Sequence, residues 1–210
     1  SDNIAIGHDT LVLSTVATSN VAVGKSALGA NTANNNTGVG THALVNNTTG
    51  TRNTAVGAYT LDANTTGSYN TSLGYVSLGS NTTGAENVAI GDAALLSSTE
   101  GDKSVAVGKD TLRSVTTGQY NTAVGYAALY NTTGSYNTAV GYQAADANTT
   151  GSVTAVGYGA GGSTTSGNVI AFGKSALRDN TSGLSNTAIG NGALANNSGA
   201  SAHYNTACGN

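Results

Sequence analysis

An apolar residue followed directly by glycine recurs along the whole chain at nearly constant spacing. Consecutive copies lie 16 or 17 residues apart, except the last two, which lie 19 apart. Two positions before the apolar residue, every copy carries Val, Ile or Thr, and this spacing is typical of a short strand with one buried face. A period held over thirteen copies predicts a stacked array in which each coil contributes one such strand. The repeat glycines are Gly7, Gly24, Gly40, Gly57, Gly74, Gly91, Gly108, Gly125, Gly141, Gly157, Gly173, Gly190 and Gly209.

The apolar and β-branched positions of these strands are predicted to form the core, because apolar side chains gain most from burial. The residue between them is Ala in most copies and otherwise only Gly38 or Ser72. Because successive side chains of a strand alternate, this small residue faces the opposite side. The predicted core comprises Val56, Val107, Val124, Val140, Val156 and Ile189.

The small-residue column contains no Lys, Glu or Gln in thirteen copies, which is unusual for a face open to water. Either short strands simply tolerate alanine, or another chain packs closely against this face. We favour close packing, and predict that Ala123, Ala139 and Ala155 lie in an interface between chains.

Val124, by contrast, is assigned to the core. Val124→Asp is therefore expected to be severely destabilising, because it buries an unpaired charge.

The second half of each coil is predicted to complete a flattened roll. A leucine four residues after the glycine, such as Leu112 or Leu129, is expected to lie on a second short strand that fills the other half of the core. A turn such as Asn64-Thr65-Thr66-Gly67 follows, in which asparagine caps the backbone and glycine supplies a positive φ. The turn residue Thr132 is expected to be exposed, so Thr132→Asp should change stability by about 0.5 kcal/mol or less. These elements predict an all-β fold, a parallel β-roll or β-solenoid of 12–13 coils of 16–17 residues.

Composition agrees with a single ordered repeat domain over residues 1–210. Val, Ile, Leu and Phe are scarce, but the formal net charge of −3 is too small to favour disorder. Charged residues make up 8 % of the chain, too few for a nucleic-acid-binding surface, and no apolar run approaches the ~18 residues of a membrane span. The chain contains no methionine, and we interpret it as a processed product or a fragment of a longer fibre protein.

No catalytic, cofactor-binding or metal-binding constellation is apparent. His8, His42 and His203 fall at different positions of different coils, without the spacing of metal ligands. No Gly-x-Ser-x-Gly elbow occurs with a histidine and an acid to serve it. We therefore expect no enzymatic activity and no cofactor.

Tyrosines form the one surface feature of interest. Tyr126, Tyr142 and Tyr158 follow the repeat glycine in three successive coils. Stacked rings with polar tips suit contact with a carbohydrate or a protein, but we favour an aromatic ladder that merely steadies adjacent coils. The asparagine of Asn64-Thr65-Thr66 is also a glycosylation sequon, although turn chemistry accounts for it without a glycan.

A flat, exposed array of threonines would indicate an ice-binding protein. The best threonine column shares its position with Ile4, Val21 and Val88, so it is predicted to point inward, which disfavours ice binding. The threonines of this column include Thr54, Thr71, Thr122 and Thr138.

The runs Asn87-Val88-Ala89-Ile90-Gly91 and Ser104-Val105-Ala106-Val107-Gly108 resemble the head repeats of trimeric autotransporter adhesins. This resemblance covers essentially the whole chain. It implies a left-handed parallel β-roll, of which three associate side by side around a common axis. In that family such heads stand outside the bacterial cell and bind host matrix or other cells. The run from Asn121 to Leu129 is equally similar to repeat regions of phage tail-fibre-like proteins.

The favoured function is therefore a non-enzymatic structural or adhesive β-solenoid that forms the head or shaft of a trimeric extracellular surface fibre. A phage tail-fibre shaft or receptor-binding segment is one alternative, and an extracellular filament subunit that assembles end to end is another. The expected partners are other copies of the chain and a host-surface protein or glycan, with no nucleic acid and no direct membrane insertion.

Overall fold

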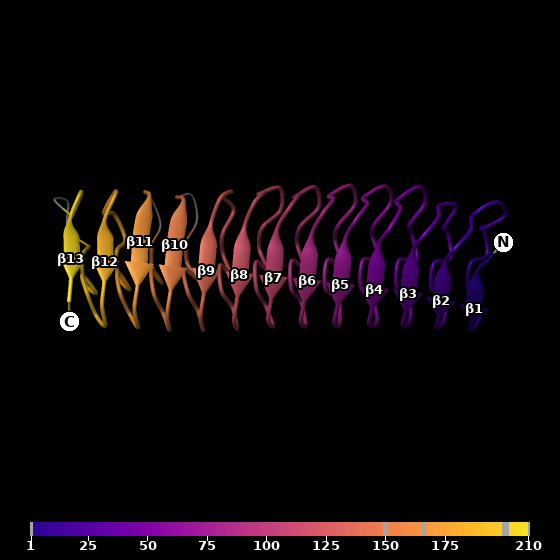
Figure 1. The fold of residues 1–210 in the computed structure, drawn as a ribbon, viewed down its shortest axis with the longest axis horizontal. Helices are drawn as coiled ribbons and strands as arrows, with labels where there is room; N and C mark the ends of the chain where they lie inside the picture. Colours follow the sequence, from indigo (N-terminus) through magenta and orange to yellow (C-terminus); the bar gives the residue numbers. More distant parts are fainter. Residues whose placement is uncertain (1, 149–150, 165–166, 199–201, 210) are drawn as a thin grey trace.

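The computed structural model describes residues 2–148, 151–164, 167–198 and 202–209. Within these ranges thirteen parallel strands form one sheet, and each strand pairs with the next along the chain. The chain is a rod with its termini at opposite ends (Figure 1), an all-β parallel β-solenoid of about 12 turns, as predicted. The strands are β1 (Ile4–Ile6), β2 (Val21–Val23), β3 (Thr37–Val39), β4 (Thr54–Val56), β5 (Thr71–Leu73), β6 (Val88–Ile90), β7 (Val105–Val107), β8 (Thr122–Val124), β9 (Thr138–Val140), β10 (Val153–Val156), β11 (Val169–Phe172), β12 (Thr187–Ile189) and β13 (Thr206–Cys208).

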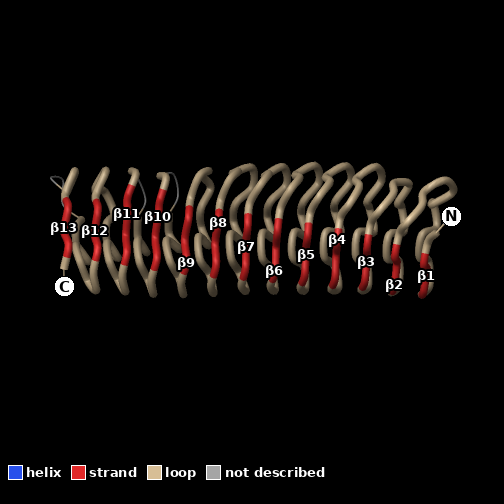
Figure 2. The backbone as a smooth tube through the Cα atoms, in the orientation of Figure 1, coloured by secondary structure: helices blue, strands red, loops and turns tan. Residues whose placement is uncertain are grey.

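The strands stack in the register that the repeat glycines predict. Ala123 pairs with Ala139 and Ala139 with Ala155, so equivalent residues of successive coils lie above one another. The strands form a single row along the rod, and the remainder of each coil loops away from them and back (Figure 2). Columns of equivalent residues are therefore physical ladders on the surface and in the interior.

The alanine column lies inside the solenoid, contrary to the prediction. Ala123, Ala139 and Ala155 have no exposed surface within a single chain. Because each side chain is already enclosed by its own chain, these residues cannot form the predicted interface with another one.

The predicted core residues point outward instead. Val140 and Ile189 are 38 % and 47 % exposed. The other four are only partly buried, namely Val56, Val107, Val124 and Val156. The alternation along the strand is thus confirmed, but the assignment of its two faces was wrong. The severe effect predicted for Val124→Asp therefore loses its physical basis.

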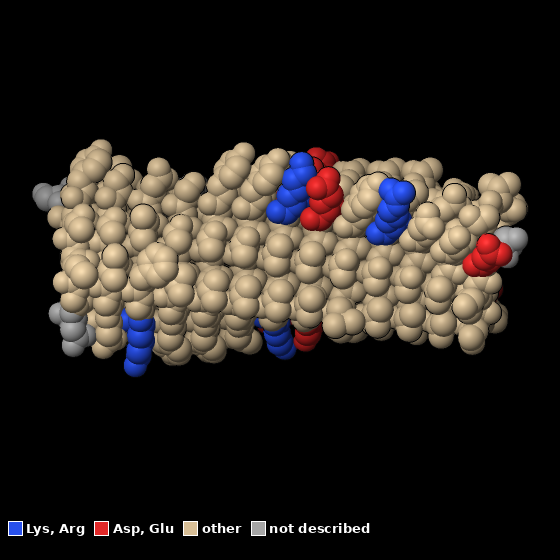
Figure 3. Space-filling model, viewed as in Figure 1, with Lys and Arg blue, Asp and Glu red and all other residues tan. Residues whose placement is uncertain are grey.

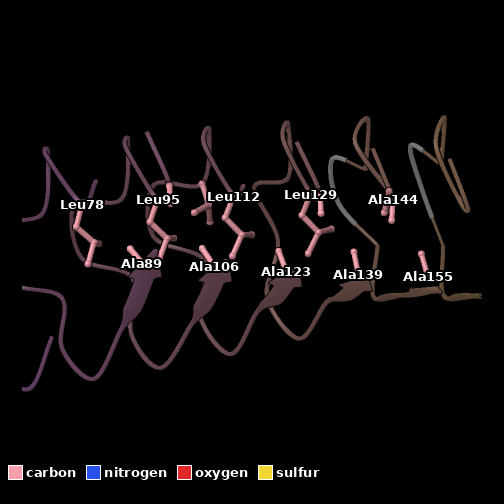
Figure 4. Close-up of a cluster of buried hydrophobic side chains, with 14 of the residues drawn as sticks. Leu78, Ala89, Leu95, Ala106, Leu112, Ala123, Leu129, Ala139, Ala144 and Ala155 are labelled. Carbon is pink, nitrogen blue, oxygen red and sulfur yellow. The ribbon is translucent and has the colours of Figure 1, made fainter. Parts of the chain in front are cut away.

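Leucine side chains explain why the inner strand position must be small. We call the residues between each repeat glycine and the following turn the return leg. Its leucines, such as Leu112 and Leu129, are buried and point toward the strand alanines (Figure 4). A Cβ atom added to Gly38 would lie 3.2 Å from Cγ of Leu28. A larger residue at this column would overpack the narrow interior.

The return leg is a series of turns rather than the predicted second strand. Leu28 has a φ of 53° and Ser26 a φ of 57°, both in the left-handed region that strands exclude. Backbone hydrogen bonds from Gly29 N to Ser26 O (3.2 Å) and from Asn31 N to Leu28 O (3.2 Å) close successive tight turns. The prediction that the leucines fill the core is confirmed, whereas the secondary structure assigned to them was wrong.

Buried asparagines form a ladder at the end of the return leg. Asn64 Nδ2 donates to Asn47 Oδ1 (2.7 Å) and to Gly67 O (3.0 Å), and Asn81 Nδ2 donates to Asn64 Oδ1 (2.8 Å). The side chain of Asn64 has no exposed surface, so this sequon is closed to glycosylation in the folded chain. Thr132 occupies the same column and is also fully buried, so the prediction that it lies exposed was wrong.

Candidate functional site

The outward face of the sheet is a uniform surface that runs along the rod. We define the strand strip as the first and third residues of each three-residue strand, together with the second and fourth residues of β10 and β11. Every position of the strip carries Val, Ile, Leu, Thr, Phe or Cys. Charged side chains lie above and below this central band in Figure 3, except at the N-terminal end. The strip is therefore apolar or weakly polar and uncharged along its whole length.

The size of the strip is that of an interaction surface. Thirteen strands at ~4.8 Å spacing and a width of about 10 Å cover on the order of 600 Å². This area lies at the upper end of the range of the largest apolar patch on a typical monomer, and such patches are often functional, although threonines make part of the strip weakly polar. The side chains are open to solvent in a single chain, since Ile6 is 62 % exposed and Phe172 41 %.

The strip is hollowed near its C-terminal end. A depression of about 450 Å³ lies along β10, β11 and β12, where Thr154, Ile170 and Thr187 contribute to its wall. Ser152 and Asn168 line its side toward the turns. This part of the strip can receive a protruding side chain.

The predicted tyrosine column forms as a stack. The ring centroids of Tyr126 and Tyr142 lie 5.3 Å apart, and those of Tyr142 and Tyr158 lie 5.1 Å apart, with nearly parallel planes. The Nζ atom of Lys174 lies 5.9 Å from the ring centroid of Tyr158, on a residue of the next coil in the same column. The facing sides of the three rings are taken up by one another and Lys174 lies on the far side of Tyr158, so the stack presents mostly ring edges and hydroxyl groups to solvent. Ligand binding by this column stays a prediction.

The histidines do not come together. His42 packs edge-on against Tyr59, and His8 lies beside Asp9 at the N-terminal end. Among the described residues, no group of three or more His, Cys, Asp or Glu side chains is arranged to hold a metal ion. In the same ranges, no helix is long and apolar enough to cross a membrane.

Sequence reasoning missed the strand strip because it placed these side chains inside. The range of residue types in each column did indicate the correct assignment. The outer columns accept residues as different as Val107, Phe172 and Cys208, whereas the inner one accepts only Ala, Gly and Ser. A narrow interior restricts size in this way, and an open face does not.

The geometry defines a β-solenoid repeat protein with one apolar, uncharged sheet face and one tyrosine-bearing return face. Comparisons with protein families, with characterised proteins and with solved structures found no match to the chain.

Proposed function

We propose that the chain is a non-enzymatic structural and adhesive segment of an extracellular fibre, and that three copies associate side by side through the strand strip. The observation that carries this proposal is the uncharged outward face of the sheet, which continues without interruption over all thirteen strands. The proposal moves the interface from the alanine column to the opposite side of the same strands.

The energetics favour burial of this face. Full burial of a Val or Ile side chain contributes ~1.5–3 kcal/mol. Most coils carry such a residue in the strip, where neighbouring residues of the same chain already leave it half-buried. A contact surface of about 600 Å² per chain approaches the ~800 Å² that each partner buries in a typical stable complex. The threonine hydroxyls at the edges of each contact can bond to one another or to water.

Charge introduced into the strip should separate the chains. We expect the unmodified protein to show three times the 20.5 kDa chain mass by light scattering, and the double variant Val107→Arg, Val124→Arg to be a folded monomer. Thr83→Arg with Thr117→Arg adds the same charge at exposed turn positions and should leave the trimer intact. A monomeric unmodified protein at micromolar concentration would contradict the proposal. A series of higher multiples would favour the end-to-end filament.

A phage tail fibre offers a second setting for the same assembly. The rod shape and the uncharged strip suit a trimeric shaft on a virion as well as one on a cell surface. Both settings are extracellular, and both place the return faces of the three chains outward.

Ice binding is a second candidate function, favoured by one specific observation. The threonine column that the sequence interpretation placed inside points outward, with Thr54 and Thr71 exposed and Thr122 and Thr138 partly so. Thr54 pairs with Thr71 and Thr122 with Thr138, so neighbouring threonines repeat at the ~4.8 Å strand spacing on an in-register sheet. A regular array of methyl and hydroxyl groups can order water in a lattice.

Thermal hysteresis tests this candidate. An ice-binding strip should give measurable hysteresis from a monomeric protein, and Thr138→Tyr should reduce it severalfold by raising one residue above the plane. Tyr136→Ser, on an exposed side chain outside the strip, is the control. Absence of hysteresis in the unmodified protein would exclude ice binding.

A further inference from the structure

The return face carries a groove on the side of the rod away from the strand strip. It has a volume of about 360 Å³ and lies where the return leg after β10 carries glycine at two outward positions, Gly159 and Gly162. The preceding coil places Gln143 and Asp146 at these positions, and the following coil places Ser175 and Arg178 there. This is the only coil in the sequence with glycine at both positions. The groove is thus one coil wide, with polar walls.

The backbone that forms the floor is held in place from both sides. Gly161 N donates to Ala176 O (2.8 Å), and Ala147 N donates to Gly162 O (2.9 Å). A Cβ atom added to Gly159 would meet no other atom within 4 Å, and one at Gly162 would lie 3.5 Å from Oδ1 of Asp146. The groove therefore exists because side chains are missing, while the coil keeps its ordinary path.

The interior beneath the groove is repacked to support this path. The core leucine is replaced by Ala145 and Gly161 in two successive coils. Val153 and Val169 are buried where most other coils carry the strand-side asparagine. A Cβ atom added to Gly161 would lie 3.6 Å from Cγ1 of Val153, so valine occupies the space that leucine leaves. Four linked exceptions to the repeat thus accompany the groove.

The two walls offer complementary hydrogen-bonding groups. Asp146 provides acceptors on one wall, and burial raises the pKa of its carboxyl group above the ordinary value. Arg178 provides donors on the other wall and is oriented by Asp179, whose Oδ2 accepts from Nε (3.0 Å) and Nη2 (2.8 Å). With Arg178 neutralised by Asp179, the groove has no excess positive charge to attract an anion. Gln143 and Ser175 each add a donor and an acceptor.

These groups match a neutral ligand with several neighbouring hydroxyls. The volume lies at the small end of the ~300–1,000 Å³ range of ligand pockets, which suits one sugar ring rather than a larger molecule. The distance between the two walls is about two strand spacings, or ~9.5 Å between backbones, which leaves room for a single ring between Asp146 and Arg178.

We propose that this groove binds one residue of a neutral glycan, through Asp146, Arg178 and Gln143. This inference gives the adhesive part of the proposed function a ligand class and a place on the rod. It does not depend on the strand strip, because no residue of the groove belongs to the strip.

Saturation-transfer NMR with free glucose, galactose and mannose, and a printed array of neutral and sialylated glycans, test the proposal on the intact chain. We expect at least one neutral sugar to bind with millimolar affinity. Asp146→Ala should weaken that binding about tenfold or more, because it removes a charged acceptor. Gly162→Leu should abolish binding by filling the groove.

Gly29→Leu is the matched control, since Gly29 occupies the same position of its coil outside the groove. It should leave binding unchanged. Binding of none of the neutral sugars, selective binding of sialylated glycans, or unaltered binding by Gly162→Leu would each overturn the proposal. Light scattering on the same samples distinguishes failure of glycan binding from failure of the proposed trimer. Strip variants that are monomeric should still bind the sugar.

Discussion

Ala139→Arg is expected to prevent the chain from folding. The alanine side chain has no exposed surface, and it lies between Ala123 and Ala155 in the sheet. Arginine here would overpack the interior and bury an unpaired charge, which together should cost more than about 4 kcal/mol. Far-ultraviolet circular dichroism and thermal melting of the purified variant provide the measurement.

The adjacent residue gives a stringent control. Val140→Arg places the same side chain one position along the same strand, on the outward face. It should retain the fold with a stability change of about 1 kcal/mol or less in the monomer. Equal loss of structure in both variants would refute the assignment of the alanine face to the core.

Gly91→Ala should produce the second largest loss of stability. The φ of Gly91 is 133°, and a Cβ atom there would lie 2.5 Å from the carbonyl oxygen of Gly108 in the next coil. Backbone strain of ~1–3 kcal/mol and overpacking of similar size add to about 2–6 kcal/mol. Chemical denaturation followed by circular dichroism should report this difference.

Gly159→Ala separates the steric effect from the general cost of replacing a glycine. Gly159 also has a positive φ, but a Cβ atom there meets nothing within 4 Å. Other coils carry Gln143 and Ser175 at this position, with φ values of 50° and 57°. The expected loss is therefore about 1 kcal/mol. A loss at Gly91 no larger than this would mean that adjacent coils are less closely stacked at the repeat glycine.

The period, the strands and their register could be predicted from the sequence because the repeat glycine allows only one alignment of the coils. The direction of the strand faces was missed. Alternation states only that Val124 and Ala123 point to opposite sides, and the restriction of the inner column to Ala, Gly and Ser was attributed to another chain. Valine was placed inside because it has more apolar surface to bury than alanine. The opposing leucine is so large, however, that only a residue as small as alanine fits on the inner face. Leu28 lies against the position of Gly38, and this contact shows that the inner residue must be small. The sequence does not state the distance between these two parts of the coil.

The candidate surfaces were predictable to different degrees. Stacking of Tyr142 on Tyr158 follows from the period alone, once the coils are in register. That the stack uses up its own ring faces depends on side-chain conformations, which only the structure provides. The groove left a trace in the sequence, because the leucine column is interrupted at Ala145 and Gly161. Its polar walls become apparent only when three successive coils are placed next to one another.

The hydrogen bonds that join one coil to the next run along the axis of the rod, which gives the segment a mechanical property. Because the coils are joined in series, a pull on the two ends loads every junction between coils with the same force, and the weakest junction opens first. A coil that detaches replaces ~4.8 Å of rod by a chain of 16 or 17 residues, and so releases about 50 Å of length. Under tension we therefore expect the rod to lengthen in discrete steps, each of which limits the force that the chain transmits.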